Sequence, residues 1–488
     1  MVTSGHLPKG LALLRAKVAS SILRVLRIEG SSMIKITKFG GSSVSSAGQF
    51  KKVKAIDQAD PSRRFVVVSA AGKRDKFDSK ITDLLYLVNA HLQYHVTCDD
   101  LLGTIGQRFC EIAKELNLSY PISHEFGIFR ELAKRGEYTS EYIVSRGEYF
   151  TGRMMAEYLG FPFVDAADVI TFRPDSSIDM DKTSEKLKAA IGEEKCFVLP
   201  GFYGATEDGK IKLLDRGGGD ITGAIVAQCL GADLYENWTD VSGFLTADPR
   251  IVDNPKSISR ITYAELRELS YMGASVLHEE AIFPVKDAGI PLVIKNTNAP
   301  DDPGTVISEE TEPGVAEPLI TGIAGKKDFV AIHVKTNHMS SKVGYIRKTL
   351  SIFERYRVSI EHIPTGIDSF AVVVQGSDVK DCLYSIVADI KSELEPDEIK
   401  IVDRLALIST VGRNMPSRPG TSGRLFGELG HAGINIRMIA QGSEELDIVV
   451  GVDVDDFERA IRVIYGAFVD SDDNIITVEE AEEEATNE

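Results

Sequence analysis

Apolar residues follow two alternating patterns between residue 33 and about residue 307. Short apolar runs, typical of buried strands, alternate with stretches in which apolar residues recur at helical spacing. The runs predict strands at residues 34–39, 65–70, 196–200, 232–238 and 292–296. The intervening stretches predict helices at residues 83–91, 148–159 and 221–230. This alternation indicates an α/β fold with a mainly parallel sheet.

The pattern changes after Pro313, where an internal repeat begins. Residues 358–366 and 434–442 align without a gap at an offset of 76 residues. The first copy predicts strand, helix, strand, strand and helix at 329–334, 344–356, 358–363, 370–374 and 379–390. The second predicts the same order at 405–411, 422–431, 434–440, 446–452 and 456–468. We therefore expect a domain over 33–312 and two βαββα units within 320–480, the first over about 320–397 and the second over about 400–470. Residues 474–478 are a candidate closing strand for the first unit.

The segment Lys35-Ile-Thr-Lys-Phe-Gly-Gly-Ser-Ser-Val44 runs an apolar strand into paired glycines and paired hydroxyls. Gly40 and Gly41 let backbone amides approach an anion, Ser42 and Ser43 add donors, and Lys38 adds a positive charge. An ordinary strand-to-helix turn has the same composition, so the phosphate-site hypothesis needs support elsewhere in the chain.

Two further clusters supply that support. In Leu213-Leu-Asp-Arg-Gly-Gly-Gly-Asp-Ile-Thr-Gly-Ala224, Arg216 and Asp220 flank three glycines, whose conformational cost favours close approach to a ligand. A buried Arg–Asp pair is the structural alternative. The third cluster, Ser145-Arg-Gly-Glu148, is followed by Thr151 and Arg153 and is predicted at a helix start, where Glu148 is a candidate for binding an ammonium group. Ligands of parallel sheets bind beyond the carboxyl ends of strands, where Lys38, Ser69 and the second glycine turn fall.

Composition narrows the class of protein. A net charge of −18 argues against nucleic-acid binding, and no apolar run is long enough for a membrane span. The five cysteines lack metal-ligand or disulfide spacing, which indicates reduced thiols and a cytoplasmic protein. The last residues, 479–488, continue an acidic stretch and predict a solvated tail.

Residues 1–32 are basic and carry one acid, Glu29. Such a segment resembles an organelle transit peptide, which would make the protein organellar. Alternatively it is an over-extended start or a dispensable appendage, since Met33 stands directly before the first core strand.

In their order and spacing, these motifs resemble the aspartokinases, of the monofunctional, feedback-regulated kind. The matching segments are Lys38-Phe-Gly-Gly-Ser-Ser-Val44, Val66-Val-Val-Ser-Ala70, Ile81-Thr-Asp-Leu-Leu85, Ser145-Arg-Gly-Glu148, Arg216-Gly-Gly-Gly-Asp220, Trp238-Thr-Asp-Val241, Thr246-Ala-Asp-Pro-Arg250, Gly273-Ala-Ser-Val-Leu-His278 and Lys295-Asn-Thr297. The resemblance implies an amino-acid-kinase α/β/α sandwich followed by two ferredoxin-like βαββαβ ACT domains. No homoserine dehydrogenase portion is expected after the acidic tail.

The implied reaction transfers the γ-phosphoryl group of ATP, carried in with Mg²⁺, to the β-carboxylate of L-aspartate. The product, 4-phospho-L-aspartate, begins lysine, threonine and methionine biosynthesis. Because the acceptor is already ionised, catalysis must neutralise charge between two anions, and no tightly bound metal is expected. The resemblance implies catalytic roles for Lys38 and Asp220, with Asp220 holding the Lys38 ammonium. It assigns substrate binding to Ser69, Thr82, Glu148 and Arg216. It assigns phosphate or nucleotide binding to Lys38, Gly40, Gly41, Ser42, Ser43, Gly217, Gly218, Thr239, Asp240 and Arg250.

This chain departs from the usual pattern at four positions. Ser42 replaces a threonine, with no expected change of role, and Gly219 replaces a serine. Asp215 stands where glycine is common, and Ser275 replaces a lysine near the nucleotide. We assign Ser275 no role and expect Arg250 or Lys256 to compensate. Trp238 is predicted to be a core residue rather than an adenine platform, and His278 to be structural.

The regulatory assignment rests on the first repeat. Met339, Lys342, Gly344, Tyr345 and Glu361 match the segment that binds lysine in lysine-sensitive relatives. Glu361 offers a carboxylate for an ammonium, and the helix start at Gly344 offers amides for a carboxylate. The resemblance implies inhibition by lysine, with threonine as a possible second effector, and a homodimer through ACT domains. A glutamate or N-acetylglutamate kinase and a non-catalytic amino-acid sensor are the alternatives.

Overall fold

The computed structural model describes residues 33–192, 195–214, 217–274, 277, 282–310, 317–416, 418–470 and 475–476. These residues divide into two compact units. The first lies within Met1–Asp240 and Glu280–Asp301, and the second within Val241–Glu279 and Asp302–Glu488. Residues 241–274 and 302–310, predicted to belong to the α/β domain, pack with the repeats in the second unit.

A parallel sheet forms the centre of the first unit. Its strands run in the order β4 (Phe197–Pro200), β2 (Arg63–Val68), β1 (Lys35–Phe39), β7 (Leu234–Thr239) and β9 (Leu292–Asn296). Four of the five β1 residues are buried, as expected for a strand covered on both faces. A smaller sheet contains β3 (Thr171–Phe172), β5 (Tyr203–Thr206) and β6 (Ile211–Leu213).

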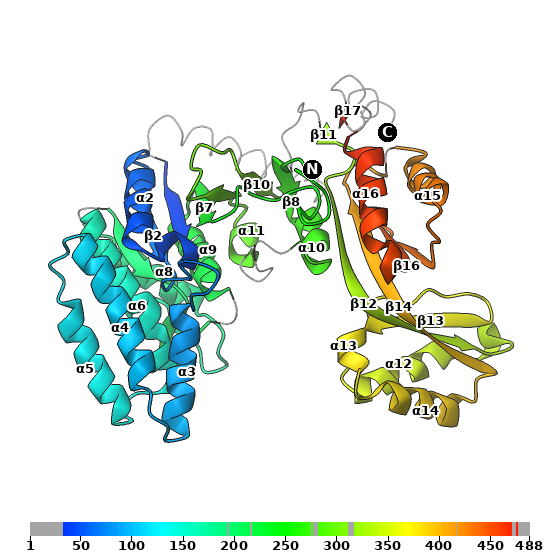
Figure 1. Cartoon of the computed structure of the whole chain (residues 1–488), viewed down its shortest axis with the longest axis horizontal. Helices are drawn as coiled ribbons and strands as arrows, with labels where there is room; N and C mark the ends of the chain where they lie inside the picture. The colour runs from blue at the N-terminus through cyan, green and yellow to red at the C-terminus, as the bar shows by residue number, and fades with distance from the viewer. Residues whose placement is uncertain are drawn as a thin grey trace, which may run out of the picture. The chain divides into compact units, whose positions relative to one another are not determined.

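Helices cover both faces of the parallel sheet (Figure 1). The helix α9 (Gly218–Leu230) contacts β1, β2 and β7, while α2 (Ala47–Gln58) and α6 (Ser140–Leu159) contact β2. The remaining helices of this unit are α3 (Ile81–Gln93), α4 (Asp99–Glu115), α5 (Ile122–Lys134), α7 (Ala166–Val169), α8 (Met180–Ala190) and α11 (Phe283–Asp287), with a short η1 (Gly41–Val44) after β1. The predicted α/β/α sandwich is confirmed.

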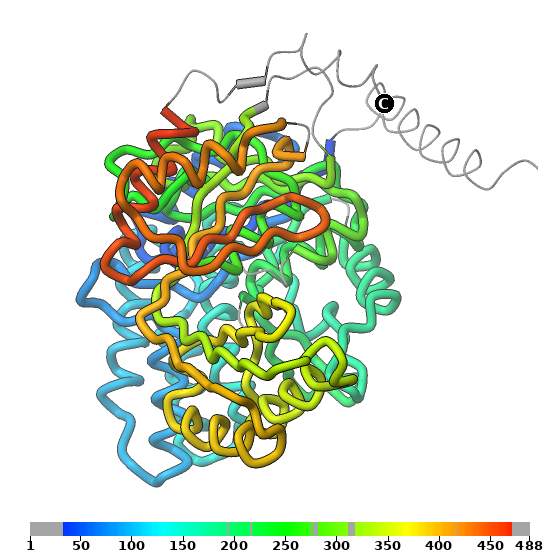
Figure 2. Tube along the Cα trace, turned by 90° about the vertical axis from the view of Figure 1, so that its right-hand side faces the viewer, coloured from blue at the N-terminus to red at the C-terminus, as the bar shows by residue number. Residues whose placement is uncertain are grey.

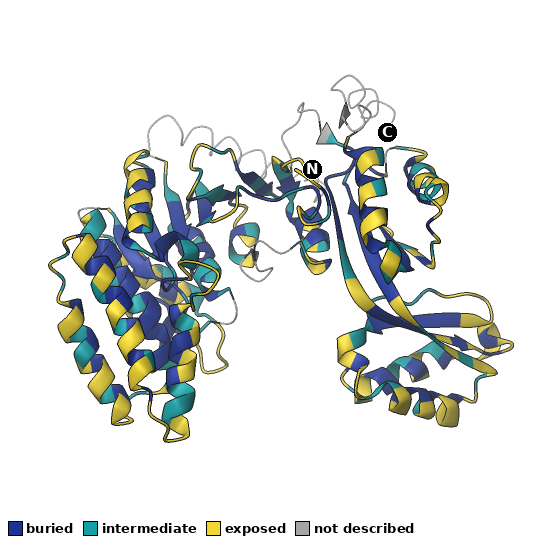
Figure 3. Cartoon of the chain, in the orientation of Figure 1, coloured by how far each residue is buried: buried dark blue, intermediate teal, exposed yellow. Residues whose placement is uncertain are grey.

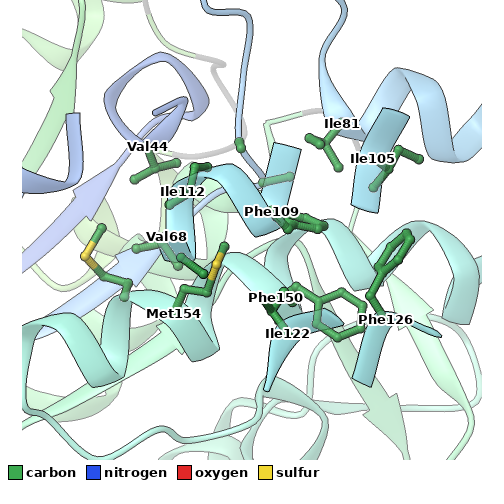
Figure 4. Close-up of a cluster of buried hydrophobic side chains, with 14 of the residues drawn as sticks. Val44, Val68, Ile81, Ile105, Phe109, Ile112, Ile122, Phe126, Phe150 and Met154 are labelled. Carbon is green, nitrogen blue, oxygen red and sulfur yellow. The ribbon is translucent and has the colours of Figure 1, made fainter. Parts of the chain in front are cut away.

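The core of the first unit joins α2–α6 to one face of the sheet. Figure 4 shows Phe109, Phe126 and Phe150 packed together, with ring centroids 5.6–6.0 Å apart in tilted or edge-on arrangements. In Figure 3 the strands are dark blue between helices whose outward faces are exposed.

Both repeats of the second unit share one antiparallel sheet, ordered β13 (Ser369–Gln375), β12 (Gly322–Lys335), β14 (Glu398–Val411), β16 (Asp447–Asp453) and β15 (Met438–Gln441). The two long strands β12 and β14 run side by side (Figure 2). The second half of β12 and the first half of β14 pair within the first repeat, and their other halves pair within the second. Each repeat therefore contains one half of β12 and one half of β14, and the other halves of the same two strands belong to the other repeat.

The helices and remaining short elements of the second unit are β8 (Arg260–Thr262), α10 (Tyr263–Tyr271), β10 (Thr305–Ser308), β11 (Glu317–Pro318), η3 (Met339–Ser341), α12 (Tyr345–Arg355), α13 (Gly376–Val379), α14 (Leu383–Leu394), α15 (Thr421–His431), η4 (Val454–Asp456), α16 (Phe457–Phe468) and β17 (Ile475–Ile476). Separate apolar clusters underlie α12 with α14 and α15 with α16.

Two predictions for the first repeat are corrected. The strand expected at 358–363 is reduced to an isolated bridge between His362 and Val373. The closing position expected for 474–478 is filled by the first half of β14, while β17 pairs with β11. A period-2 pattern cannot show that one 14-residue strand serves two repeats.

Candidate active site

Lys38 lies at the carboxyl end of β1 and faces α9. Its Nζ forms an ion pair with Oδ1 of Asp220, in the first turn of α9. The amide of Asn237, opposite Lys38 on β7, donates to the same oxygen over 2.8 Å. Only 6% of Lys38 is exposed. Asn237 holds the Asp220 carboxylate, and the ion pair with Asp220 in turn fixes the Lys38 ammonium in one place.

The next residues on β1 and β7, Phe39 and Trp238, point their side chains to the face of the sheet opposite to that of Lys38 and Asn237. Phe39 and Trp238 stack with ring centroids 6.0 Å apart, and the Trp238 indole N–H donates to Glu236 over 2.9 Å. Trp238 is 1% exposed. Its prediction as a core residue is confirmed, and the alternation of side chains along β1 and β7 explains why Lys38 and Asn237 meet α9 instead.

Some of the polar groups of the first glycine turn, residues 40–43, are already hydrogen-bonded to other parts of the protein. The Gly40 N–H donates to the Trp238 carbonyl over 2.9 Å, and the Ser43 hydroxyl shares a 2.8 Å hydrogen bond with Thr297. Ser43 is 1% exposed. The amides of Gly41 and Ser42 have no hydrogen-bond partner among the described residues. In this conformation the turn therefore offers an anion the amides of Gly41 and Ser42, and not the Ser43 hydroxyl.

Gly41 packs against Gly72 in the segment that follows β2. The Gly72 N–H donates to the Gly41 carbonyl over 2.8 Å. A Cβ on Gly72 would lie 2.6 Å from the Gly41 carbonyl carbon, and a Cβ on Gly41 would lie 2.9 Å from the Ala70 oxygen. Both glycines are needed because two backbone segments touch here.

The second glycine turn has a local reason for each glycine. Gly217 adopts a φ of 82°, and a Cβ on Gly218 would lie 2.5 Å from the Phe202 ring. A Cβ on Gly219 would lie 2.8 Å from Ser69 Oγ and 3.4 Å from Lys38 Cε. Close packing and backbone conformation thus account for the three glycines. The sequence alone favoured close approach of the backbone to a ligand as their explanation. They also bring Ser69 beside Lys38.

Glu148 lies within α6, two turns after the helix begins at Ser140. The predicted position at a helix start is corrected, because residues 140–147 are also helical. A Cβ on Gly147 would lie 2.9 Å from the Ala70 Cβ, so this glycine lets α6 approach the segment after β2. That approach places the Glu148 carboxyl beside the Ala70 backbone N–H, which acts to lower the pKa of that carboxyl.

The Glu148 carboxyl is buried with one oxygen unsatisfied. The residue is 4% exposed, and Oε2 has no hydrogen-bond partner among the described residues. Burial raises the pKa of Glu148 to about 8, opposed by the Ala70 amide and the Arg146 guanidinium. A buried acceptor without a donor is costly, so this oxygen is suited to a cationic ligand.

Arg146 does not neutralise Glu148 through a direct bond. Its guanidinium lies over the rings of Tyr142 and Tyr149, at 4.2 Å and 4.4 Å, and donates to Ser145 Oγ. This aromatic cage is a sufficient structural role for Arg146.

Thr82 occupies the first turn of α3, where it is partly exposed. It follows the same chain segment that carries Ser69, Ala70 and Gly72.

Taken together, these contacts bring five predicted or neighbouring residues of the site close to one another, either directly or through one intervening residue. They are Lys38, Ser69, Glu148, Gly219 and Asp220.

The predicted nucleotide residues are dispersed over both units. Thr239 ends β7, and its hydroxyl donates to the exposed Asp240 over 3.2 Å. Arg250 belongs to the second unit, where its side chain is 87% exposed and pairs with Asp248 at 2.6 Å. Lys256, the other candidate to replace a lysine at Ser275, donates to the Val469 carbonyl over 2.5 Å.

Four predicted or discussed positions, Asp215, Arg216, Ser275 and His278, lie outside the described residues. Sequence reasoning missed Asn237 and the Ala70 amide. Asn237 stands directly before the Trp238-Thr-Asp motif and lies opposite Lys38 in the pairing of β1 with β7. Its side chain therefore points to the same face of the sheet as that of Lys38, and this alternation was the available signal.

The predicted regulatory residues cluster around the start of α12. Lys342 Nζ donates to Thr336 over 2.6 Å and lies 5.4 Å from the Tyr345 ring centroid. Gly344 caps α12 with a φ of 76°, and Met339 is buried. Glu361 instead accepts a 2.6 Å hydrogen bond from the Tyr271 hydroxyl at the end of α10.

Within residues 33–192, 195–214, 217–274 and the other described segments, no cluster of His, Cys, Asp or Glu could hold a metal ion. None of the five cysteines forms a disulfide with another described residue. No helix in the described part of the chain is long and apolar enough to span a membrane.

Comparison with known families defines the class of protein. The model of the amino acid kinase family matches residues 33–296, more than half of the chain, and a model of the ACT domain matches residues 408–468. The chain belongs to the amino acid kinase family. The match includes α10, although this helix packs with the repeats in the second unit.

Individual relatives narrow the assignment. Aspartokinase 3 of Bacillus subtilis is 35% identical over 449 residues, which cover 89% of this chain and 98% of the relative. The crystal structure of Clostridium acetobutylicum aspartate kinase is 48% identical, covers 90% of this chain and 100% of its own, and superposes with a TM-score of 0.84. E. coli aspartokinase III in complex with aspartate and ADP is 25% identical, covers 89% and 99%, and gives a TM-score of 0.68. Within its family the chain therefore belongs to the aspartokinases, phosphotransferases with a carboxyl group as acceptor.

Proposed function

We propose that the cluster around Lys38 and Glu148 phosphorylates the β-carboxylate of L-aspartate with ATP, giving 4-phospho-L-aspartate. The observation that carries this proposal is the unsatisfied, buried Oε2 of Glu148, linked through Ala70 and Ser69 to the Lys38–Asp220 pair. A cationic group bound at Glu148 and an anion at Lys38 match the two ends of an amino acid with an acidic side chain. The aspartate and ADP bound by E. coli aspartokinase III support this substrate pair.

Charge neutralisation is the central task of the proposed site. Both the aspartate carboxylate and the ATP phosphates are anionic, so Lys38 would lower their repulsion as the phosphoryl group passes between them. Asp220 and Asn237 keep its ammonium in position, which makes Asp220 a positioning group rather than a base. The acceptor needs no base because it is ionised at neutral pH.

The substrate would be held at its other end by Glu148 and by the segment after β2. Glu148 would bind the α-ammonium, while Ser69 and Thr82 would hydrogen-bond the substrate. Arg216 is proposed, from the family resemblance, to bind a substrate carboxylate. The amides of Gly41 and Ser42, with Gly217 and Gly218 nearby in sequence to Asp220, would meet phosphate oxygens. Mg²⁺ would arrive with ATP as part of the substrate.

Capture of the acyl phosphate tests the reaction directly. Hydroxylamine converts an acyl phosphate to a hydroxamate, so ATP-dependent hydroxamate is measured with aspartate, glutamate and N-acetylglutamate in parallel. The proposal predicts product with aspartate and at least tenfold less with the other two acids, because an added methylene displaces the reacting carboxylate and N-acetylation removes the ammonium that Glu148 would bind. Equal or greater turnover of glutamate or N-acetylglutamate contradicts it.

We propose further that the reaction is the first step toward lysine, threonine and methionine, and that the second unit confers feedback inhibition. Lysine is the proposed effector, with threonine as a possible second one, and a cytoplasmic homodimer formed by ACT domains is the proposed assembly. Glu361 would bind the effector ammonium in exchange for its hydrogen bond from Tyr271. Because α10 lies within the kinase family match, that exchange would link effector binding to the catalytic region.

A further inference from the structure

One loop carries several groups of the proposed aspartate site. The segment between β2 and α3, residues 69–80, is here called the 69–80 loop. It begins at Ser69, beside Gly219 and Lys38, and continues to the Ala70 amide on Glu148. Gly72 then touches Gly41. A shift of this loop would move Ser69 and Ala70 together with the start of α3.

The outer part of the 69–80 loop cannot hold itself in place by its own packing. Residues 73–77 and 79–80 are exposed, and Phe77 is 87% exposed. Arg74 closes a local contact by donating to Asp78 through its backbone N–H and its Nε, over 3.0 Å and 2.9 Å. Exposed ion pairs of this kind stabilise little. A second exposed pair joins Arg74 to Glu111 on α4 at 3.4 Å, so the loop depends mainly on what lies beneath its two ends.

Arg108 lies beneath both ends. It is 3% exposed on α4, where the neighbouring buried positions are Leu102, Ile105, Phe109 and Ile112. Its Nη2 donates to the Gly72 carbonyl over 2.5 Å, and its Nη1 donates to the Ser79 carbonyl over 2.6 Å. Nη2 also lies 3.4 Å from Asp78 Oδ2. One planar guanidinium thus joins the beginning and the end of the 69–80 loop.

A guanidinium is an expensive group to bury on an apolar helix face. An aliphatic side chain would pack there without that cost but would leave the Gly72 and Ser79 carbonyls without these donors. Lysine has one ammonium and cannot reproduce the two-pronged geometry. The arrangement is therefore explained by the need to fix the loop rather than by packing of α4.

We propose that Arg108 is a positioning residue for the aspartate site, fixing the 69–80 loop so that Ser69, the Ala70 amide and Thr82 keep the positions that substrate binding requires. Arg108 does not touch the proposed substrate. The inference rests on the proposed binding of aspartate against Glu148.

The test compares three variants and one control variant with the parent enzyme. Arg108→Lys keeps the charge, Arg108→Met removes it, and Glu148→Gln probes the substrate site itself. Arg424→Lys is the matched control, because Arg424 in the second unit also donates to a backbone carbonyl, that of Ala467, over 2.6 Å. For each protein we would measure the KM for aspartate, the KM for ATP, kcat, the melting temperature and hydrogen exchange of residues 72–79.

We expect Arg108→Lys to raise the aspartate KM about tenfold or more, with a smaller change in the ATP KM and faster exchange in residues 72–79. Arg108→Met should show the same effects more strongly, and Arg424→Lys should leave the aspartate KM within about twofold of the parent. If Arg108→Met does not fold, the lysine variant decides the outcome.

Two results would overturn the inference in distinguishable ways. A lower melting temperature in Arg108→Lys with unchanged aspartate KM and unchanged exchange shows that Arg108 only stabilises the fold. An unchanged aspartate KM in Glu148→Gln shows instead that the proposed substrate site, on which the inference depends, is wrong.

Discussion

The Tyr271 hydroxyl donates a 2.6 Å hydrogen bond to the Glu361 carboxylate. Tyr271 ends α10, a helix within the kinase family match, and Glu361 belongs to the first repeat. A fully buried carboxylate, Glu265, anchors the other end of α10 by pairing with Arg413 and accepting from Thr321. A helix of the kinase family match is thus attached to the repeats of the second unit at both of its ends.

The Tyr271–Glu361 bond predicts opposite effects of two substitutions on the proposed inhibition by lysine. Glu361→Gln removes the negative charge that would bind the effector ammonium, so the half-inhibitory concentration should rise about tenfold or more. Tyr271→Phe removes only the competing donor, so that concentration should fall about twofold to fivefold, since the pair is partly exposed. The measurement is a lysine titration of kinase activity, and equal shifts in the same direction would contradict the proposed exchange.

The raised pKa of Glu148 predicts that aspartate binding releases a proton. At pH 7 a carboxyl with a pKa of about 8 is mostly protonated, and an arriving ammonium stabilises its ionised form. Calorimetric titration with aspartate in two buffers of different ionisation enthalpy should show release of roughly one proton. Glu148→Gln should abolish it, whereas Glu141→Gln, a partly exposed glutamate on the same helix, should not. A binding enthalpy that is the same in both buffers would count against this account.

The same group predicts the pH dependence of stability in the unliganded protein. The folded pKa of about 8 lies above the ordinary value of 4.5, so the unfolded chain loses this proton first as pH rises. Its contribution to the free energy of unfolding is fully present below pH 4.5 and is lost as pH rises through 8. Denaturant titrations at pH 5, 7 and 9 should show a smaller decline in Glu148→Gln than in the parent. An identical decline in both would refute the assignment.

Contact between Gly41 and Gly72 predicts a large effect of one added methyl group. Gly72→Ala would place a Cβ 2.6 Å from the Gly41 carbonyl carbon and 2.8 Å from the Ser42 nitrogen. The two turns must separate, so kcat/KM should fall about a hundredfold. Gly48→Ala, on α2, meets nothing closer than 3.8 Å and should stabilise the protein by about 0.5–1 kcal/mol without loss of activity. Steady-state kinetics and thermal unfolding of both variants provide the comparison.

The α/β core was predictable because its strands are buried on both faces and read as continuous apolar runs. The position of Glu148 inside α6 was not, because Gly147 interrupts helical propensity and its packing reason, the Ala70 Cβ, is remote in sequence. The shared strands β12 and β14 were hidden for a similar reason, since each half alone has the length of an ordinary strand.

Among the site residues, the charged ones were predictable from the chemistry of a phosphate site. The partners that each side chain contacts in the folded protein were not predictable. Lys38 and Asp220 carry charges that a phosphate site needs, and the structure pairs them. Ser43 has the same residue type as Ser42, yet its hydroxyl bonds Thr297, a partner 254 residues away. Arg108 was detectable only as a lone cation on the apolar face of a helix, a pattern that indicates burial but not the carbonyls it meets.

The most direct test of the central claim measures ATP-dependent aspartyl hydroxamate formation by the parent enzyme and by Lys38→Ala. Lys38 would lie between two anions in a buried site, so the substitution should reduce kcat at least a thousandfold, a loss of about 4 kcal/mol of transition-state stabilisation. Because the substitution leaves Asp220 without its partner, the melting temperature should fall, and thermal unfolding confirms that the variant is folded at the assay temperature. Undiminished turnover by folded Lys38→Ala would contradict the claim that this cluster is the site of phosphoryl transfer.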